Sequence, residues 1–281
     1  MKNCVIFFNC HGGQIYKQLY SSKIFINQYK VDFISLYDYL EGYKYSNEKD
    51  LIQEHLTLIK EADLIILQYI KINKKKIISH EYINSLLKKE TKIILIPHYT
   101  FSGYNYPYDI FNDEFISGGK DKKELESYIN NLFINDKDKI ITHINNELEN
   151  IKYLDTLSDV KCYEFVKYNY NKQQLFYSRS YPTYILFNYI SQQILYLIGM
   201  NDILKPIWTS YANHTLEPIY PQVKNFLNIE FNIKFNYECN LLEYIICCKK
   251  NNVNNLLLIN KKIGKSHTND ILNIIKSNKF R

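Results

Sequence analysis

A cysteine and a histidine stand side by side in the first tight turn that the sequence predicts. The run CVIFF (4–8) is apolar and rich in β-branched and aromatic residues, which is typical of a buried parallel strand. Cys10 and His11 follow it after a single asparagine, and Gly12 and Gly13 lead into apolar residues at helical spacing. Ligands of open α/β sheets bind at the carboxyl ends of the strands. This strand–turn–helix unit therefore places a thiol and an imidazole at a candidate ligand site.

Two kinds of chemistry fit this turn. A thiol at a helix N-terminus and beside an imidazole is a candidate nucleophile. Glycines at the same place, together with Asn9, let backbone N–H groups approach a phosphate or an oxyanion. The simpler alternatives are a Cys10 that only fills the core, as most free cysteines do, and a phosphate cradle in which the thiol takes no part. The turn matches neither the Rossmann nor the P-loop pattern, so nicotinamide and Walker-type chemistry are not expected.

The elements that position this turn repeat along the first part of the chain. Three more strands are predicted at 30–39, 62–69 and 91–99, and amphipathic helices are predicted at 47–61 and 80–90. Right-handed crossovers between such units produce a parallel sheet whose strands all end at one edge. The predicted fold class is α/β: a mostly parallel sheet flanked by helices, with a helical insertion and a helical C-terminal part.

Polar residues stand at the ends of these predicted strands. Asp38 is near the end of the second strand, Gln68 ends the third, and His98 follows Pro97 after the fourth. We expect them to be neighbours of Cys10, because parallel strands bring their carboxyl ends to the same edge. This convergence is the main physical argument from sequence for a site.

The chain is predicted to have three parts. Residues 1–111 form the α/β domain with the Cys10 turn. Residues 112–165 form a helical insertion or cap, in which no chemistry is expected, and 166–281 form a mainly helical part that completes the site.

Side chains outside the strand ends add to the predicted site. An aromatic loop (100–111) follows the fourth strand, and its Ser102 and Tyr104 either contact a base or sugar or only anchor the loop. Arg179, one of two arginines in the chain, precedes a helix predicted at 182–199 and can hold a phosphate or a carboxylate.

The bulk composition excludes several classes of protein. The net charge of +6 comes from lysines on several predicted elements, which favours a solvated surface over a nucleic-acid interface. Six cysteines without metal-ligand spacing indicate a reducing, cytoplasmic setting (the host's, if the source is viral) with neither disulfides nor a metal site. No apolar run reaches the roughly 18 residues of a membrane span, and no signal peptide is expected. The 27 tyrosines and the many Asn, Lys and Ile residues point to an AT-rich microbial or viral genome.

Five stretches of the chain, in the same order, resemble the WcbI-like polysaccharide-biosynthesis family. The Asn-Cys turn, the Asp-x-x-x-x-Gln strand and the Pro-x-x-x-Phe-x-Gly-Tyr loop in series are the more specific features. The stretches cover most of the chain outside 112–165 and the tail, and they are FFNCHGGQIYKQL (7–19), ADLIILQYI (62–70), IILIPHYTFSGYNYPYD (93–109), FYSRSYPTYILFNYISQQILYLIG (176–199) and EPIYPQVKNFLNIEF (217–231).

The chain departs from the family pattern at three places. His11 stands where family members usually have glutamine, and His98 where they usually have asparagine. Tyr181 replaces the histidine of the family's His-Pro pair ahead of the long helix. If that histidine is the family's base, its role is either lost here or taken by His11, His98 or His214.

The resemblance implies a CoA-dependent acetyltransferase that acts on a sugar amine or hydroxyl in glycan or nucleotide-sugar biosynthesis. Its cofactor would be coenzyme A or acetyl-CoA, and its acceptor a sugar or nucleotide-sugar. The alternatives are a Cys/His-dependent esterase or deacetylase at the same site and a non-catalytic glycan- or nucleotide-binding protein. Whether the chain forms a homo-oligomer is left open. The candidate catalytic residues are Cys10, His11, His98 and His214, and the candidate CoA-binding residues are Asn9, Gly12, Gly13, Lys17, Gln68, Lys71, Ser102, Tyr104 and Arg179.

Overall fold

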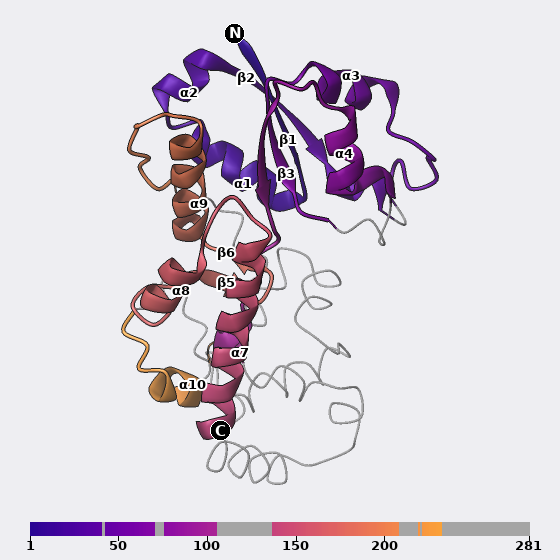
Figure 1. Cartoon of the computed structure of the whole chain (residues 1–281). Helices are drawn as coiled ribbons and strands as arrows, with labels where there is room; N and C mark the ends of the chain where they lie inside the picture. The colour runs from indigo at the N-terminus through magenta and orange to yellow at the C-terminus, as the bar shows by residue number, and fades with distance from the viewer. Residues whose placement is uncertain (41–42, 71–75, 106–136, 208–218, 220, 232–281) are drawn as a thin grey trace, which may run out of the picture. The chain divides into compact units, whose positions relative to one another are not determined.

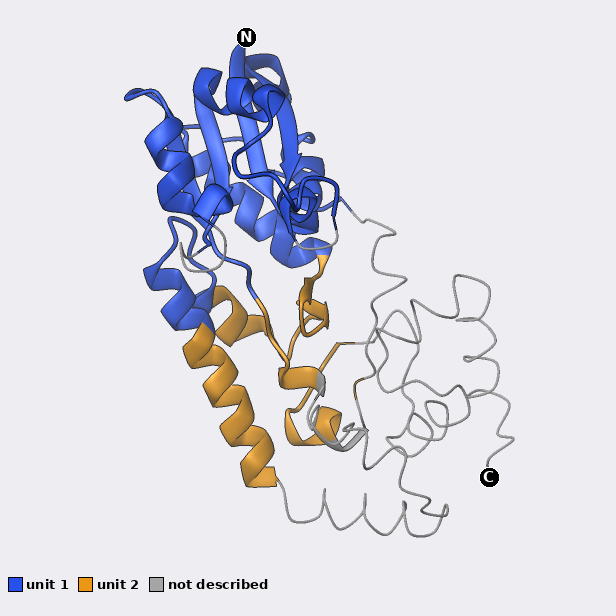
Figure 2. Cartoon of the chain, turned by 90° about the vertical axis from the view of Figure 1, so that its right-hand side faces the viewer, with its two compact units in different colours: residues 1–99, 151–164, 184–209 blue, residues 100–150, 165–183, 210–281 orange. Residues whose placement is uncertain are grey.

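The computed structural model describes residues 1–40, 43–70, 76–105, 137–207, 219 and 221–231 (Figure 1). The chain divides into two compact units that do not follow its order (Figure 2). Unit 1 consists of residues 1–99, 151–164 and 184–209, and unit 2 consists of residues 100–150, 165–183 and 210–281.

A parallel sheet of four strands forms the centre of unit 1. The strands are β1 (Lys2–Phe8), β2 (Tyr29–Ser35), β3 (Leu64–Gln68) and β4 (Lys92–Ile96), in the order β2-β1-β3-β4. All three neighbouring pairs are parallel, which confirms the predicted fold class. The central strands β1 and β3 carry the continuous apolar runs, because side chains on both faces of a central strand are buried.

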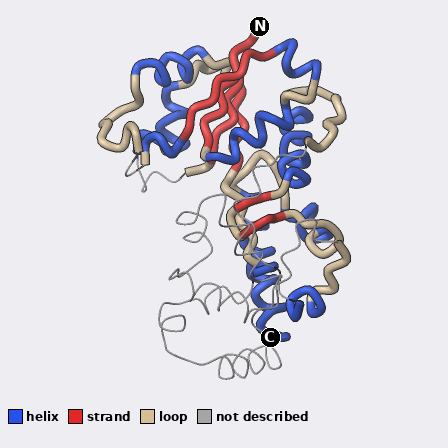
Figure 3. The backbone as a smooth tube through the Cα atoms, turned by 180° about the vertical axis from the view of Figure 1, so that it is seen from behind, coloured by secondary structure: helices blue, strands red, loops and turns tan. Residues whose placement is uncertain are grey.

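Helices cover both faces of this sheet (Figures 1 and 3). The helices α3 (Gln53–Glu61) and α4 (His80–Leu86) lie on one face. The opposite face carries α1 (Cys10–Leu19), α2 (Lys23–Gln28) and α9 (Tyr184–Leu197), of which α1 and α9 pack against each other.

Element ends differ from the sequence prediction at several places. The strand predicted at 30–39 ends at Ser35, where a 3-10 helix η1 (Leu36–Tyr39) begins. The helix predicted at 47–61 begins at Gln53, and the helix predicted at 80–90 ends at Leu86. Pro182 lies in a short strand ahead of α9, not at the start of the helix.

Unit 2 is built around aromatic side chains and a two-stranded antiparallel sheet. The sheet consists of β5 (Phe176–Ser178) and β6 (Tyr181–Pro182). The other elements are η3 (Gly103–Asn105) and α10 (Pro221–Phe226), while α7 (Lys137–Thr156) and α8 (Tyr163–Asn169) each contribute residues to both units. The ring of Phe101 stacks on that of Phe176 and meets that of Tyr104 edge-on, at centroid distances of 5.3 and 5.2 Å.

Within the predicted helical insertion at 112–165, residues 137–156 are helical, in α7. Residues 112–136 of that insertion and residues 232–281 of the predicted C-terminal part lie outside the described residues. Within the ranges that are described, no helix has both the length and the apolar character needed to cross a membrane.

Candidate functional site

The turn after β1 is held by an asparagine that caps α1. The Asn9 side-chain Oδ1 accepts a hydrogen bond from the His11 N–H at 2.9 Å, and the Asn9 carbonyl accepts one from the Gly12 N–H at 3.0 Å. Asparagine is a preferred N-cap because its side chain satisfies a backbone donor that the helix leaves unpaired. These bonds engage two of the N–H groups that the sequence suggested as oxyanion donors.

Gln68 ties the end of β3 to the end of β1. Its Oε1 accepts a hydrogen bond from the Asn9 N–H at 3.0 Å, and both residues are buried, at 9% and 5% exposure. With Oε1 occupied in this way, the two N–H donors of the Gln68 amide face elsewhere. Gln68 is therefore fixed in orientation at the carboxyl edge of the sheet.

Two imidazole rings meet at the same edge. The rings of His11 and His98 are edge to face, with centroids 4.5 Å apart and an interplanar angle of 68°. His11 is only 3% exposed, and its other neighbour is the ring of Phe187 from α9, at 5.3 Å. His98 is half-buried and lines a pocket, so His98 is the imidazole that a ligand in that pocket can contact.

The thiol of Cys10 lies beside a tyrosine hydroxyl. The distance from Cys10 Sγ to Tyr37 Oη is 3.7 Å, and Tyr37 belongs to the 3-10 helix that follows β2. The sequence suggested Asp38 as the polar residue from this strand. Because β2 ends at Ser35, the side chain that reaches the thiol is that of Tyr37 instead.

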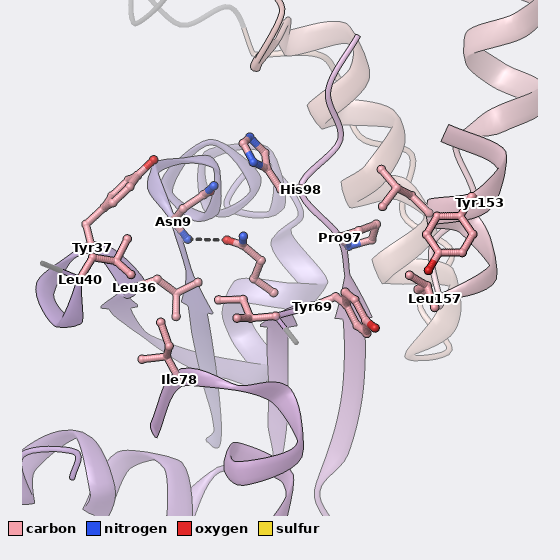
Figure 4. A pocket seen from close by; sticks show the side chains of 13 residues that line it. Asn9, Leu36, Tyr37, Leu40, Tyr69, Ile78, Pro97, His98, Tyr153 and Leu157 are labelled. Carbon is pink, nitrogen blue, oxygen red and sulfur yellow. Dashed lines mark hydrogen bonds between the residues drawn. The ribbon is translucent and has the colours of Figure 1, made fainter. Parts of the chain in front are cut away.

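A pocket of about 540 Å³ runs across the carboxyl ends of the strands (Figure 4). It lies entirely within unit 1, and its size is in the usual range for small-molecule sites. Asn9, Gln68 and His98 supply polar groups, and apolar and aromatic side chains supply most of the rest. The other lining residues are Leu36, Tyr37, Leu40, Tyr69, Ile70, Ile78, Pro97, Tyr153, Leu154 and Leu157.

The end of α7 contributes one wall of this pocket, through Tyr153, Leu154 and Leu157. It is held in place by the buried carboxylate of Asp155, which accepts hydrogen bonds from the Tyr99 hydroxyl at 2.8 Å and from two backbone N–H groups. The sequence indicated no chemistry in 112–165, and this wall was missed, because a helical pattern does not reveal which distant strand it contacts.

The two glycines of the turn differ in what surrounds them. A Cβ on Gly12 would lie 2.6 Å from Phe8 Cβ and 2.6 Å from Phe33 Cε2, whereas a Cβ on Gly13 would have no atom within 4 Å. Gly12 therefore lets α1 approach the sheet closely. Gly13 is the glycine of the pair with open space beside it.

Ser102 and Tyr104 are anchored within unit 2. Ser102 Oγ lies 2.9 Å from His143 Nε2, and the Ser102 N–H donates to Glu147 at 2.6 Å. The Tyr104 hydroxyl donates to the Tyr170 carbonyl at 2.6 Å, and burial raises the pKa of Tyr104 far above its ordinary value. Both residues thus have loop-anchoring contacts, which is one of the two roles predicted for them from sequence.

The candidate cations are not among the residues that line the pocket. Lys17 is exposed on α1, and Arg179 is exposed between β5 and β6 in unit 2, where its carbonyl accepts from the Phe101 N–H. Lys71 and His214 lie outside the described residues. The pocket lining as described contains no lysine or arginine, and no group of three or more His, Cys, Asp or Glu side chains among the described residues could hold a metal ion.

Comparison with known proteins gives a match in structure. No family model matches the sequence, and no curated protein matches it. A solved structure, that of WcbI, is similar with a TM-score of 0.67 and 15% sequence identity, over 99% of this chain and 96% of that one. The chain has a WcbI-like fold. WcbI is described as a novel polysaccharide biosynthesis enzyme, and the matched structure as the native protein without a disulfide bond between coenzyme A and one of its cysteines.

Proposed function

We propose that this protein is a CoA-dependent acetyltransferase that acts on an amine or hydroxyl of a sugar in glycan or nucleotide-sugar biosynthesis. The observation that carries the proposal is the pocket at the carboxyl edge of the sheet. There His98 and Gln68 line one cavity, and Cys10 lies beside its Tyr37 wall. The fold is that of a polysaccharide biosynthesis enzyme, which supports a glycan-related acceptor.

His98 is the base in this proposal. It is the imidazole that lines the pocket, and the buried ring of His11 packs edge-on against it and restricts its orientation. Acetyl-CoA supplies an activated acyl group: the acceptor oxygen or nitrogen bonds to the acyl carbon as the carbon–sulfur bond breaks, and the acceptor proton passes through His98 to the CoA sulfur. An imidazole suits this task because its ordinary pKa lies near neutrality.

Gln68 is the donor to the charge that develops on the acyl carbonyl oxygen. Its Oε1 is occupied by the Asn9 N–H at 3.0 Å, so its amide cannot rotate without losing a buried hydrogen bond. A donor fixed before the reaction needs no reorganisation when charge develops, which is the condition for effective oxyanion stabilisation. The strand pairing of β1 with β3 thus supports the orientation of this donor.

Cys10 lies beside the donor thioester and does not carry the acyl group. Its Sγ is 3.7 Å from the hydroxyl of Tyr37, which lines the pocket, while Cys10 itself is not one of the lining residues. WcbI is described with reference to a disulfide between coenzyme A and a cysteine. We take Cys10 to be the cysteine of this chain that lies near the sulfur end of coenzyme A.

The pocket fits the thioester end of coenzyme A better than its phosphates. Its lining combines apolar walls with a few polar groups and no cation, as described above. We propose that the phosphates extend beyond it to Lys17, which belongs to the same unit, with Lys71 as a further candidate. Affinity should then fall as the salt concentration rises, because phosphate contacts are screened.

The acceptor sugar is proposed to lie along Tyr69, Pro97 and Tyr153. These side chains form the pocket wall between the end of β3 and the end of α7 (Figure 4). Tyrosine offers an apolar face for the C–H side of a sugar ring and a hydroxyl for its polar rim. The base His98 lines the same pocket and comes directly after Pro97.

The test is an assay of turnover with acetyl-CoA and a panel of amino sugars and nucleotide-sugars, in which the released CoA thiol is measured. We expect acceptor-dependent thiol release, and a loss of about 10²- to 10⁴-fold in kcat for His98→Gln, the usual contribution of a general base. His55→Gln is the matched control, because His55 does not line the pocket and contacts the Tyr39 hydroxyl instead. Release of acetate from acetylated sugars without CoA would indicate the esterase or deacetylase. Binding of a nucleotide-sugar with no turnover would indicate a binding protein.

A further inference from the structure

Four aliphatic side chains of the pocket lining belong to or pack against one hydrophobic core, and we call them the acyl lobe: Leu36, Leu40, Ile70 and Ile78. Leu36 and Ile78 are buried members of the hydrophobic core, and Leu40 and Ile70 are partly buried and pack against that same core. Figure 4 shows Leu36, Leu40 and Ile78 on one side of Asn9, and Tyr153 and Leu157 on the opposite side, beyond Pro97. Asn9 and His98 therefore lie between two sets of apolar and aromatic side chains (Figure 4).

We infer that the acyl lobe holds the chain of an acyl donor longer than acetyl, in the range from butyryl to hexanoyl. This inference rests on the proposed acyl transfer and changes only the acyl group that is transferred. The bonds formed and broken stay as above, since the chain beyond the carbonyl carbon takes no part in them. Each methylene that enters the lobe leaves water and meets leucine and isoleucine side chains, which is favourable.

The pantetheine arm of coenzyme A fits the lobe less well than an alkyl chain does. That arm carries two amides, and a buried amide without a hydrogen-bond partner is costly. The four side chains of the acyl lobe offer no polar atom. The polar side chains of the described lining are those of Asn9, Gln68 and His98, together with tyrosine hydroxyls, of which that of Tyr37 lies next to the Cys10 thiol.

An acetyl group would leave most of the acyl lobe unused. Its single methyl cannot contact four aliphatic side chains at once, whereas a chain of four to six carbons can. The gain for each buried methylene corresponds to about a fourfold change in affinity. Two methylenes, the difference between acetyl and butyryl, give about a 15-fold change if both are fully buried.

The experiment is calorimetric titration of the full chain with acetyl-, butyryl- and hexanoyl-CoA, and also with octanoyl-CoA for the Leu40→Ala variant. We expect affinity to rise along the series, by about 15-fold from acetyl to butyryl. Leu40→Trp should fill the lobe and remove this preference. Leu40→Ala enlarges the lobe without overpacking the core, so it should move the preference toward octanoyl-CoA. Leu86→Trp is the control, because Leu86 packs on the same core but does not line the pocket, and it should keep the wild-type preference.

Three results would overturn the inference in distinguishable ways. If acetyl-CoA binds and all three acyl-CoA compounds bind with the same affinity, the acyl lobe does not hold the acyl chain, and the proposed acetyl transfer stands. If no acyl-CoA binds at all, the proposed function fails and the inference fails with it. If both Leu40 variants fold and still show the wild-type rise in affinity along the series, the acyl chain binds elsewhere, and the assignment of the acyl lobe is contradicted.

Discussion

Gln68 has two proposed roles, as an acceptor for the Asn9 N–H and as a donor in the reaction, and two substitutions distinguish them. Its Oε1 accepts the buried Asn9 N–H at 3.0 Å, and its N–H donors are assigned to the reaction. Gln68→Glu keeps an acceptor for Asn9 and removes the donors. Gln68→Leu removes both. The two variants should therefore differ in stability and agree in their loss of activity.

The expected magnitudes follow from burial. Asn9 is 5% exposed, so Gln68→Leu leaves a buried N–H unpaired, which costs about 1–3 kcal/mol in the free energy of unfolding. That loss lowers Tm by about 2–4 °C for each kcal/mol in a unit of this size. Gln68→Glu should keep most of the wild-type stability. Both variants should lose about 10²- to 10³-fold in kcat, the usual cost of one oxyanion donor.

The assay pairs urea unfolding with steady-state turnover on the same preparations. Gln193 provides the control, because its Oε1 also accepts a backbone N–H, that of Lys161 at 3.0 Å, and it does not line the pocket. Gln193→Glu should keep full kcat. The reasoning is refuted if Gln68→Glu is as active as the wild type, since its amide would then donate nothing to the reaction.

Three further sets of substitutions test other parts of the site. Gly12→Ala should cost about 1–3 kcal/mol in urea unfolding, because its Cβ would lie 2.6 Å from Phe8 Cβ, while Gly13→Ala should be neutral or stabilising; equal effects would contradict the close approach of α1 to the sheet. Cys10→Ala and Cys10→Ser should each keep kcat within about tenfold of the wild type, whereas losses on the order of 10³-fold in both would favour a covalent relay. Lys17→Ala should weaken acetyl-CoA binding by about 1–3 kcal/mol in low-salt calorimetry; an unchanged Kd would remove Lys17 from the phosphate site.

Much of the fold could be predicted because the local patterns agree with the global one. The apolar runs of β1 and β3 are long and uninterrupted, and the spacing of the strands leaves right-handed crossovers and a parallel sheet as the simple solution. The end of β2 could not be predicted, because its sequence continues with β-prone residues through Tyr39 while the chain turns into a 3-10 helix at Leu36. That difference of a few residues exchanges Asp38 for Tyr37 at the edge.

Sequence could predict which residues the strand ends bring together, and it could not predict the part of the pocket that depends on distant packing. Topology alone brings Asn9, Gln68 and His98 to one edge, and the structure places all three around one pocket. Nothing local to 112–165 indicates that the end of α7 reaches this pocket, since the hydrogen bond from Tyr99 to Asp155 joins residues 56 positions apart. Sequence also could not show whether His11 or His98 faces the pocket, because that depends on which of the two imidazoles is buried.

Binding of acetyl-CoA to this protein is tested most directly by calorimetric titration of the wild-type chain at low salt. We expect one binding event with a Kd in the micromolar range, about 8 kcal/mol at 1 μM, and weaker binding as salt is added. Absence of heat and of a thermal shift with millimolar acetyl-CoA would contradict this expectation.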